Sequence, residues 1–163
     1  MGKDSWYDTA QICLNGHSIN SMAVSSPERN QNFCDKCGAK TITDCPHCKH
    51  CIRGKYHISG AFHFSEFHPP KFCHHCGQPY PWTESTIEAA KEYADELEKL
   101  TPEEREKLKK SIDDLVQDTP KTQLAASRFK QLVTKAGGST ADIFQKVLVN
   151  IISETAKKLI WPS

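Results

Sequence analysis

The feature that most constrains this chain is the spacing of its cysteines and histidines. All eight Cys fall between Cys13 and Cys76, and all eight His fall between His17 and His75, within a chain of 163 residues. Three pairs of Cys are separated by two residues, and one Cys-His pair is separated by three. A C-x2-C pair folds as a tight turn that directs both sulfurs toward one point, as a tetrahedral zinc ion requires. We therefore expect the first half of the chain to be organised around metal.

The four close pairs supply eight donors, which is enough for two structural zinc ions with four protein ligands each. The expected ligands are Cys13, His17, Cys34, Cys37, Cys45, Cys48, Cys73 and Cys76. Sequential pairing joins the first four and the last four, whereas interleaved pairing, as in cross-brace folds, joins the first pair with the third and the second with the fourth. We favour sequential pairing, because residues 56–64 alternate like a strand between the last two pairs. The apolar face of that strand is formed by Tyr56, Ile58, Phe62 and Phe64.

Residues next to these pairs add detail to the expected turns. Gly38 and Gly77 each follow a C-x2-C pair, where such a turn favours a positive φ. Phe33 and Phe72 each precede one of the same pairs, and we expect both rings to pack beside the metal in place of a larger core.

Cys51 is left over from the eight cysteines. It is a bystander thiol, an alternate ligand in place of Cys45, or a reactive thiol with a pKa lowered by neighbouring bases.

Two disulfide-related observations bear on the redox setting. Eight cysteines in a short chain also suit a disulfide framework, but pairs spaced by two residues suit a metal better. The first residues lack the apolar stretch of a signal peptide, so we expect a cytoplasmic protein with reduced thiols.

The second half of the chain has helical rather than cysteine-rich character. Residues 83–163 show a periodicity of 3.6 residues, which predicts an α-helical domain of about four helices after a zinc-ribbon module at residues 1–82. Start signals lie at Thr83, at Thr101-Pro102 with Glu104, at Thr119-Pro120 and at Ser139. We expect the apolar stripes to bury one another, although the last helix, which runs to Ile160, has enough apolar surface to contact a partner or a second copy. The expected fold is thus a small metal-stabilised β zinc-ribbon module followed by an α-helical domain.

Several of these motifs together resemble a bacterial protein family known only as a domain of unknown function. The resemblance is carried by Cys13-x2-Gly16-His17, Phe33-Cys34-x2-Cys37-Gly38, Cys45-Pro46-x-Cys48, Phe72-Cys73-x2-Cys76-Gly77-x-Pro79-x-Pro81-Trp82 and Leu124-Ala125-x2-Arg128. It implies an N-terminal pair of zinc ribbons and a bacterial, cytoplasmic setting, and it implies no activity. The run Cys48-Lys49-His50-Cys51 is not matched to this pattern.

Charge and motif content narrow the expected functions. Residues 1–82 hold eight Lys and Arg against six Asp and Glu. Two Zn²⁺ bound through seven thiolates change that balance to about −1, which does not favour binding to phosphates. No apolar run approaches the roughly 20 residues of a membrane span, and no nucleophile triad or phosphate loop is present. We expect no enzyme but an adaptor with two structural zinc ions that binds a protein partner or a second copy through its helical half. The alternative is a zinc-ribbon protein that binds nucleic acid.

Overall fold

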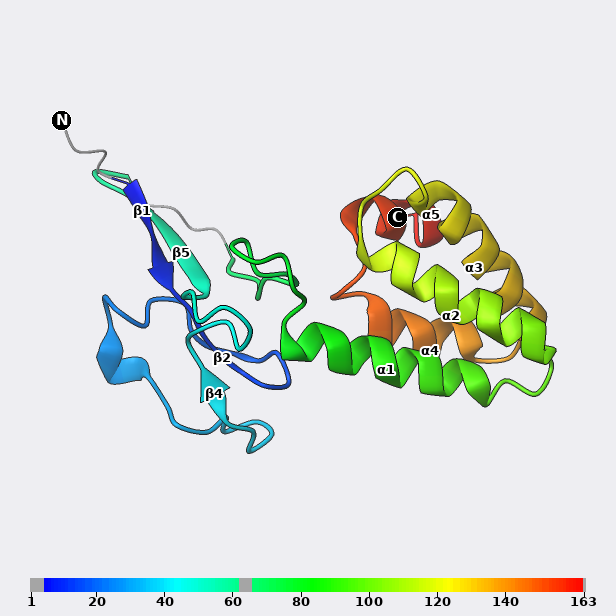
Figure 1. Cartoon of the computed structure of the whole chain (residues 1–163), viewed down its shortest axis with the longest axis horizontal. Helices are drawn as coiled ribbons and strands as arrows, with labels where there is room; N and C mark the ends of the chain where they lie inside the picture. Colours follow the sequence, from blue (N-terminus) through cyan, green and yellow to red (C-terminus); the bar gives the residue numbers. More distant parts are fainter. Residues whose placement is uncertain (1–4, 62–65, 163) are drawn as a thin grey trace. The chain divides into compact units, whose positions relative to one another are not determined.

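The computed structural model describes residues 5–61 and 66–162. The chain divides into two compact units, residues 1–84 and residues 85–163, which we call the cysteine-rich unit and the helical unit. The first is a small β region that contains two clusters of metal-ligating side chains, and the second consists of helices (Figure 1). The expected fold class is confirmed.

Short strands form two antiparallel sheets in the described part of the cysteine-rich unit. The strands are β1 (Ser5–Thr9), β2 (Gln11–Cys13), β3 (Ser18–Asn20), β4 (Thr41–Ile42) and β5 (Arg53–Ile58), with a short 3-10 helix at Pro27–Arg29. One sheet pairs β1 with β5, and the other has the order β3-β2-β4. The second sheet positions metal-ligating side chains, because β2 ends at Cys13 and β3 begins one residue after His17.

The strand expected at residues 56–64 is only partly as predicted. It begins earlier, as β5, and a turn at Ser59-Gly60 follows it. Tyr56 and Ile58 do share a face, but that face is open, with 41% and 37% of the two residues exposed. The reason is that β5 pairs only with β1, where Tyr7 lies opposite Tyr56, so nothing apolar covers this side in the described residues. The expected positions Phe62, His63 and Phe64 lie outside the described residues.

A buried carboxylate ties β1 to the loop after β3. Asp8 accepts hydrogen bonds from the backbone N–H groups of Thr9 and Val24 and from the hydroxyl of Ser25, and His57 Nε2 lies 3.1 Å from its second oxygen. Burial raises the pKa of Asp8, but the hydrogen bond from Ser25 and the others outweigh it and hold that pKa below its usual value. Asp8 is therefore a charged anchor rather than an exposed acid.

The apolar core of the cysteine-rich unit is small and lies against the second cysteine cluster. Its members are Ala10, Ile12, Cys45, Ile52, Cys73, Tyr80 and Trp82. The rings of Tyr80 and Trp82 stack with their centroids 4.7 Å apart, and Trp82 Nε1 donates a hydrogen bond to Pro70 O. Phe72 is half-buried, whereas the prediction for Phe33 is wrong, because 63% of that residue is exposed. Trp82 occupies the core that Phe33 was expected to help form.

The helical unit contains most of α1 and all of the later helices. The helices are α1 (Pro81–Asp95), α2 (Pro102–Val116), α3 (Thr122–Ala136), α4 (Thr140–Leu148) and α5 (Glu154–Ile160). The start of α2 is as predicted, because Thr101 and Glu104 form a reciprocal capping box with Pro102 in the first turn. Helix α3 ends at Gly137, which has a φ of 67°, a conformation that glycine adopts without strain.

Two details of the expected helices differ. Helix α1 begins at Pro81, so Thr83 lies inside the helix, where its hydroxyl donates to Lys71 O instead of capping the end. The expected last helix is two helices, because the chain turns after Leu148 and Ser153 starts a new helix by accepting a hydrogen bond from Ala156 N. The described residues therefore form five α-helices rather than about four.

The helices enclose a core of their own. Phe144 is fully buried and makes edge-to-face contacts with Tyr93 and Phe129, at centroid distances of 5.0 and 5.3 Å. Three of the six buried residues of α3 are alanines, while Leu124 is 52% exposed. In the described part of the chain, none of the helices has the length and apolar character needed to cross a bilayer.

Candidate metal centres

The three C-x2-C pairs adopt the same turn. In each turn, the first Cys N–H donates to the carbonyl five residues later, and the residue four positions after that Cys donates back to the Cys carbonyl, at 2.8–2.9 Å. The residue before the turn bridges to the residue six positions after the first Cys, in the pairs Phe33–Lys40, Asp44–Cys51 and Phe72–Pro79. The shared hydrogen bonds place both sulfurs of a pair on the inside of the turn.

This turn needs a left-handed residue after the second Cys. Gly38 and Gly77 supply it with φ values of 75° and 77°, as predicted. Lys49 supplies it with a φ of 63° in the Cys45–Cys48 turn, which we call the third turn because it holds the third of the four close pairs. Lys49 is the only residue other than glycine with a positive φ in the described residues. A side chain in this conformation costs roughly 1–2 kcal/mol relative to glycine. The third turn thus carries strain that the other two avoid.

The Cys13–His17 pair lies in the turn between β2 and β3. Gly16 has a φ of 90°, and its N–H donates to Cys13 O at 2.9 Å. A Cβ on Gly16 would lie 2.9 Å from Trp82 Cβ, which is closer than two non-bonded carbon atoms approach one another. Gly16 is therefore required both by the turn and by the packing of Trp82 against it.

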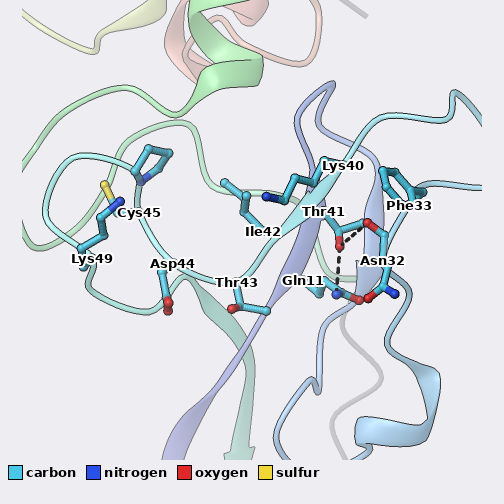
Figure 2. Close-up of a pocket in the computed structure, with 11 residues that line it drawn as sticks. Gln11, Asn32, Phe33, Lys40, Thr41, Ile42, Thr43, Asp44, Cys45 and Lys49 are labelled. Atoms are coloured by element: carbon cyan, nitrogen blue, oxygen red, sulfur yellow. Dashed lines mark hydrogen bonds between the residues drawn. The ribbon is translucent and has the colours of Figure 1, made fainter.

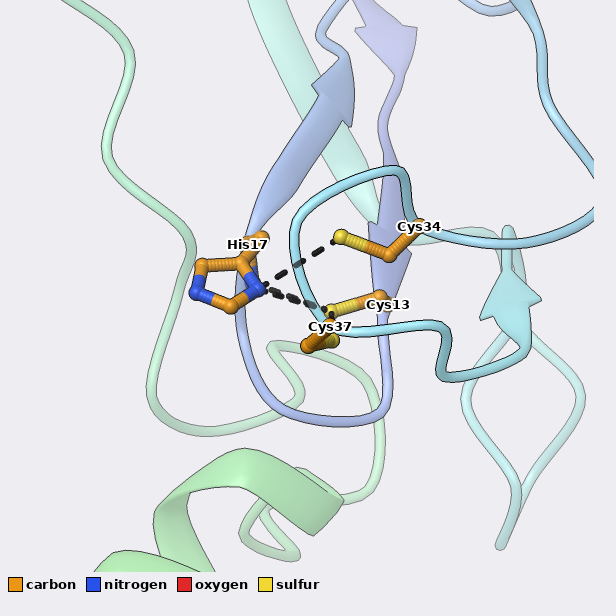
Figure 3. A group of neighbouring side chains, drawn as sticks. All are labelled: Cys13, His17, Cys34 and Cys37. Carbon is orange, nitrogen blue, oxygen red and sulfur yellow. Dashed lines mark hydrogen bonds between the residues drawn. The ribbon is translucent and has the colours of Figure 1, made fainter.

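The first cluster joins this turn to the Cys34–Cys37 turn (Figure 3). Nδ1 of His17 lies 3.4 Å from Cys13 Sγ and 3.5 Å from Cys34 Sγ, and Cys13 Sγ lies 3.7 Å from Cys37 Sγ. A disulfide needs sulfurs about 2.05 Å apart, so these thiols are not bridged. The four donors surround one point that could hold a metal ion.

The second cluster joins the Cys45–Cys48 turn to the Cys73–Cys76 turn. Cys45 Sγ lies 3.7 Å from Cys76 Sγ, and Cys48 Sγ lies 3.7 Å from Cys73 Sγ. The structure therefore brings together the sequential pairs and not the interleaved ones, and it brings together all eight of the expected ligands. Each cluster gathers four donors within 4.8 Å of one another.

Several sulfurs of the clusters accept hydrogen bonds from N–H groups, although burial raises the pKa of Cys13. Backbone N–H groups of His17, Lys36 and His75 donate to Cys13, Cys34 and Cys73. A hydrogen bond from the backbone of Ala39 and one from the amide of Asn15 lower the pKa of Cys37 to about 6. The thiolate is the form that binds metal, so the two hydrogen bonds to Cys37 prepare this residue for a cation. Asn15 was not expected from the sequence, since a single amide inside a turn gives no distinctive signal.

The thiols of the second cluster shift the pKa values of one another. Burial raises the pKa of Cys73, but hydrogen bonds from the backbone of Cys76 and His75 outweigh it and bring the value to about 6. A backbone hydrogen bond from His50 lowers the pKa of Cys48, whereas burial and the other three thiols raise it to about 12. Four thiols this close cannot all ionise without a cation among them, because like charges oppose one another.

Cys51 lies outside both clusters and is exposed. It occupies the bridge position six residues after Cys45, equivalent to Lys40 and Pro79 in the other turns. Because that position lies on the stem of the turn, its side chain does not point to the inside as Cys45 and Cys48 do. The C-x2-C spacing at Cys48 and Cys51 is therefore a coincidence of sequence.

The other histidines among the described residues lie outside the clusters. His50 stacks on His75 with the ring centroids 4.4 Å apart and contacts His74 edge-to-face at 5.0 Å. His57 stacks on Trp6 and faces Asp8, while His68 is exposed and lies 3.9 Å from Glu66. In the described residues, no group of three or more metal-ligating side chains other than the two clusters comes within coordinating range.

Alkylation of the native protein is expected to modify Cys51 alone. Its thiol is exposed and outside both clusters, whereas the other seven are grouped for metal binding. Mass spectrometry after a short treatment with iodoacetamide should show one added group, located at Cys51, and eight groups after chelation. Modification of Cys45 in place of Cys51 would show that the third turn uses the other pair.

Comparisons with known proteins place the chain in a family. The model of a family described as "Uncharacterized protein conserved in bacteria (DUF2321)" matches residues 6–160. No curated protein and no solved structure matches the chain. Since the match extends over nearly the whole sequence, the chain belongs to this bacterial family, as the resemblance of its motifs implied.

Proposed function

We propose that this member of the family is a non-enzymatic zinc-binding adaptor. Two structural zinc ions hold the cysteine-rich unit in shape, and the unit serves as a platform for another protein. The observation that carries this proposal is the donor set, because each cluster gathers four protein donors around one point. Four protein ligands are typical of structural zinc, whereas catalytic zinc has three and keeps one position open.

The donor geometry fits zinc. Zn–S bonds of about 2.3 Å in a tetrahedron place two sulfurs about 3.8 Å apart, and a Zn–N bond of about 2.05 Å places the nitrogen about 3.6 Å from a sulfur. The closest sulfurs lie 3.7 Å apart in both clusters, and His17 Nδ1 lies 3.4 and 3.5 Å from two sulfurs in the first. Sulfur-rich tetrahedral sites favour zinc over hard cations such as magnesium or calcium.

A buried hydroxyl near the second cluster supports the same assignment. Tyr80 is 1% exposed, and its hydroxyl has no hydrogen-bond partner among the described residues. Burial and then the thiol of Cys73 raise its pKa, so the hydroxyl keeps its proton beside the cysteines. A metal-bound thiolate is a better acceptor for this proton than a thiol is.

The distribution of exposed apolar residues supports a docking role. In the described residues eight large apolar side chains are exposed, and only Leu124 belongs to the helical unit. The other seven, which include Trp6, Tyr7 and Tyr56, lie in the cysteine-rich unit. Trp and Tyr dominate the binding energy of many protein interfaces. We therefore propose that this unit contacts the protein partner, in the reducing setting of the cytoplasm where thiols stay free to bind zinc.

Metal analysis tests the zinc assignment. Purified protein is expected to contain two zinc ions per chain, and single substitutions in one cluster, such as Cys34→Ser, should reduce this to one. Elemental analysis by mass spectrometry gives both numbers. A content of one or three zinc ions in the unmodified protein, or a content of iron, would contradict the proposal.

Affinity capture tests the adaptor role. The zinc-loaded chain should retain a specific protein from an extract of its own cell, and Tyr7→Ser with Tyr56→Ser should reduce that retention. Leu124→Ser is the matched control, because it removes an exposed apolar side chain from the helical unit. Equal retention by both variants would argue against this surface, and light scattering shows whether the retained partner is a second copy.

A further inference from the structure

A hollow on the cysteine-rich unit lies beside the Cys45–Cys48 turn, and Cys45 of the second cluster is part of its lining. It has a volume of about 620 Å³ and extends from the strand β4 to the third turn (Figure 2). Phe33 and Lys40 lie at one end, Lys49 at the other, and Ile42 between them. The volume lies within the range of pockets that hold small organic groups.

The cationic groups of this hollow are not neutralised by the protein. Lys40 and Lys49 both line it, and neither makes an ion pair within the described residues. One acidic residue, Asp44, is also part of the lining. By contrast, four lysines of the helical unit pair with carboxylates. The hollow therefore presents two ammonium groups that are available to an anion.

Lys49 is held in a conformation that glycine would adopt without strain. Its φ is 63°, whereas Gly38 and Gly77 occupy the equivalent position in the other two turns. A residue kept in a strained backbone conformation at a surface hollow points to a role for its side chain. The side chain of Lys49 carries a charge to the edge of the hollow that glycine cannot supply.

Phe33 gives the hollow an exposed aromatic face. The ring precedes Cys34, as Phe72 precedes Cys73, but Phe33 is 63% exposed while Phe72 is half-buried. No other aromatic ring contacts Phe33 in the described residues. An exposed ring next to free ammonium groups is the combination with which proteins bind unpaired nucleotides, because bases stack on the ring while phosphates approach the cations.

We propose that this hollow binds single-stranded nucleic acid, with a base stacked on Phe33 and the adjoining phosphates close to Lys40 and Lys49. The proposal goes beyond the adaptor role and does not depend on it. A duplex does not fit, because its bases are stacked on one another and cannot reach the ring. An acidic peptide would satisfy the lysines but would leave the Phe33 face without a planar partner. The overall charge of about −1 on the zinc-loaded unit makes the expected affinity moderate and sensitive to salt.

The test measures binding of the full zinc-loaded chain to fluorescently labelled oligo-dT and oligo-U at low salt. Phe33→Ala is expected to weaken binding roughly ten-fold by loss of stacking. Lys40→Ala and Lys49→Gly should each weaken binding several-fold and reduce the slope of log affinity against log salt by about 0.7, the value for one phosphate contact on a single strand. Lys36→Ala is the matched control, since Lys36 is an exposed lysine of the second turn outside the hollow.

Lys49→Gly separates binding from structure. Because glycine suits the φ of 63°, this variant should be as stable as the unmodified protein or more stable, while it binds the oligonucleotide less tightly. Zinc content is measured for each variant. If another variant loses metal, the affinity of Lys40→Ala for the oligonucleotide is compared with that of the unmodified protein instead. The proposal is overturned if the unmodified chain does not bind either oligonucleotide, if Lys36→Ala loses as much affinity as Lys40→Ala, or if polyglutamate competes as well as the oligonucleotides.

Discussion

Chelation of the metal is expected to unfold the cysteine-rich unit and to leave the helical unit folded. The strands of the cysteine-rich unit are two to six residues long. Four of its buried apolar side chains are themselves cysteines of the clusters: Cys13, Cys34, Cys45 and Cys73. Structural zinc contributes about 10–16 kcal/mol to folding in modules of this kind. Without it, three thiols and an imidazole in the first cluster and four thiols in the second would have no cation to hold them together, and the core beside them is small.

The helical unit should respond differently because its core contains no metal ligand. Phe144, Leu148 and Ile152 are fully buried there, and Ser153 N donates to Leu115 O to fix the last helix. In an amide NMR spectrum, chelation should collapse the signals of β1–β5 toward random-coil positions while the signals of α2–α5 remain dispersed. The helical circular dichroism should change little.

Substitutions distinguish loss of metal from other effects of the chelator. Cys34→Ser should unfold the first cluster and its neighbouring strands, since serine is a poor zinc ligand. Cys51→Ser is the control, because Cys51 lies in neither cluster and should leave both the zinc content and the spectrum unchanged. Retention of dispersed signals in β2 and β3 after complete removal of zinc would contradict the role of the metal in folding.

The candidate site was predictable because the spacing of a turn determines where its side chains point. Cys34 and Cys37 had to face one ion, since two intervening residues close the turn, and the glycines at 38 and 77 marked its left-handed end. The choice between Cys45 and Cys51 was not determined by spacing, because both lie three residues from Cys48. It is settled by hydrogen bonds: Cys45 N donates to His50 O and starts the turn, which leaves Cys51 on the stem.

Parts of the fold that depend on contacts between distant segments could not be predicted. The strand β1 was not expected, since it is ordered by pairing with β5, about 50 residues later in the chain. The core includes Trp82 from beyond the last cysteine pair, whereas Phe33 is exposed, and neither could be foreseen because burial depends on contacts between distant segments. Capping signals are local, and for that reason the starts of α2 and α5 can be explained from Thr101 and Ser153 alone.

Gly54→Ala is expected to destabilise the cysteine-rich unit by about 3 kcal/mol or more, the upper end of the cost of overpacking. A Cβ at this position would overlap Ser21 O and would lie 2.8 Å from Thr9 C and 2.9 Å from Ala10 N. All three atoms belong to the backbone, so no side chain can rotate away to make room. The loop cannot easily retreat, because Lys55 N donates to Ser21 O and Asp8 holds the same loop through Val24 and Ser25.

Gly38→Ala provides the matched comparison, because the two glycines are constrained in opposite ways. Gly38 has a positive φ of 75° but open space around it, so alanine there should cost only roughly 1–2 kcal/mol. Urea unfolding of the zinc-loaded variants, followed through the amide signals of β1 and β5, gives both free energies. If steric contact at the crossing of β5 and the Ser21 loop dominates, Gly54→Ala must cost more than Gly38→Ala. The reverse order would mean that the loop containing Ser21 moves away from β5 to make room for the added methyl group. The backbone conformation of the cysteine turns would then contribute more to the stability of the unit than the contact between β5 and this loop.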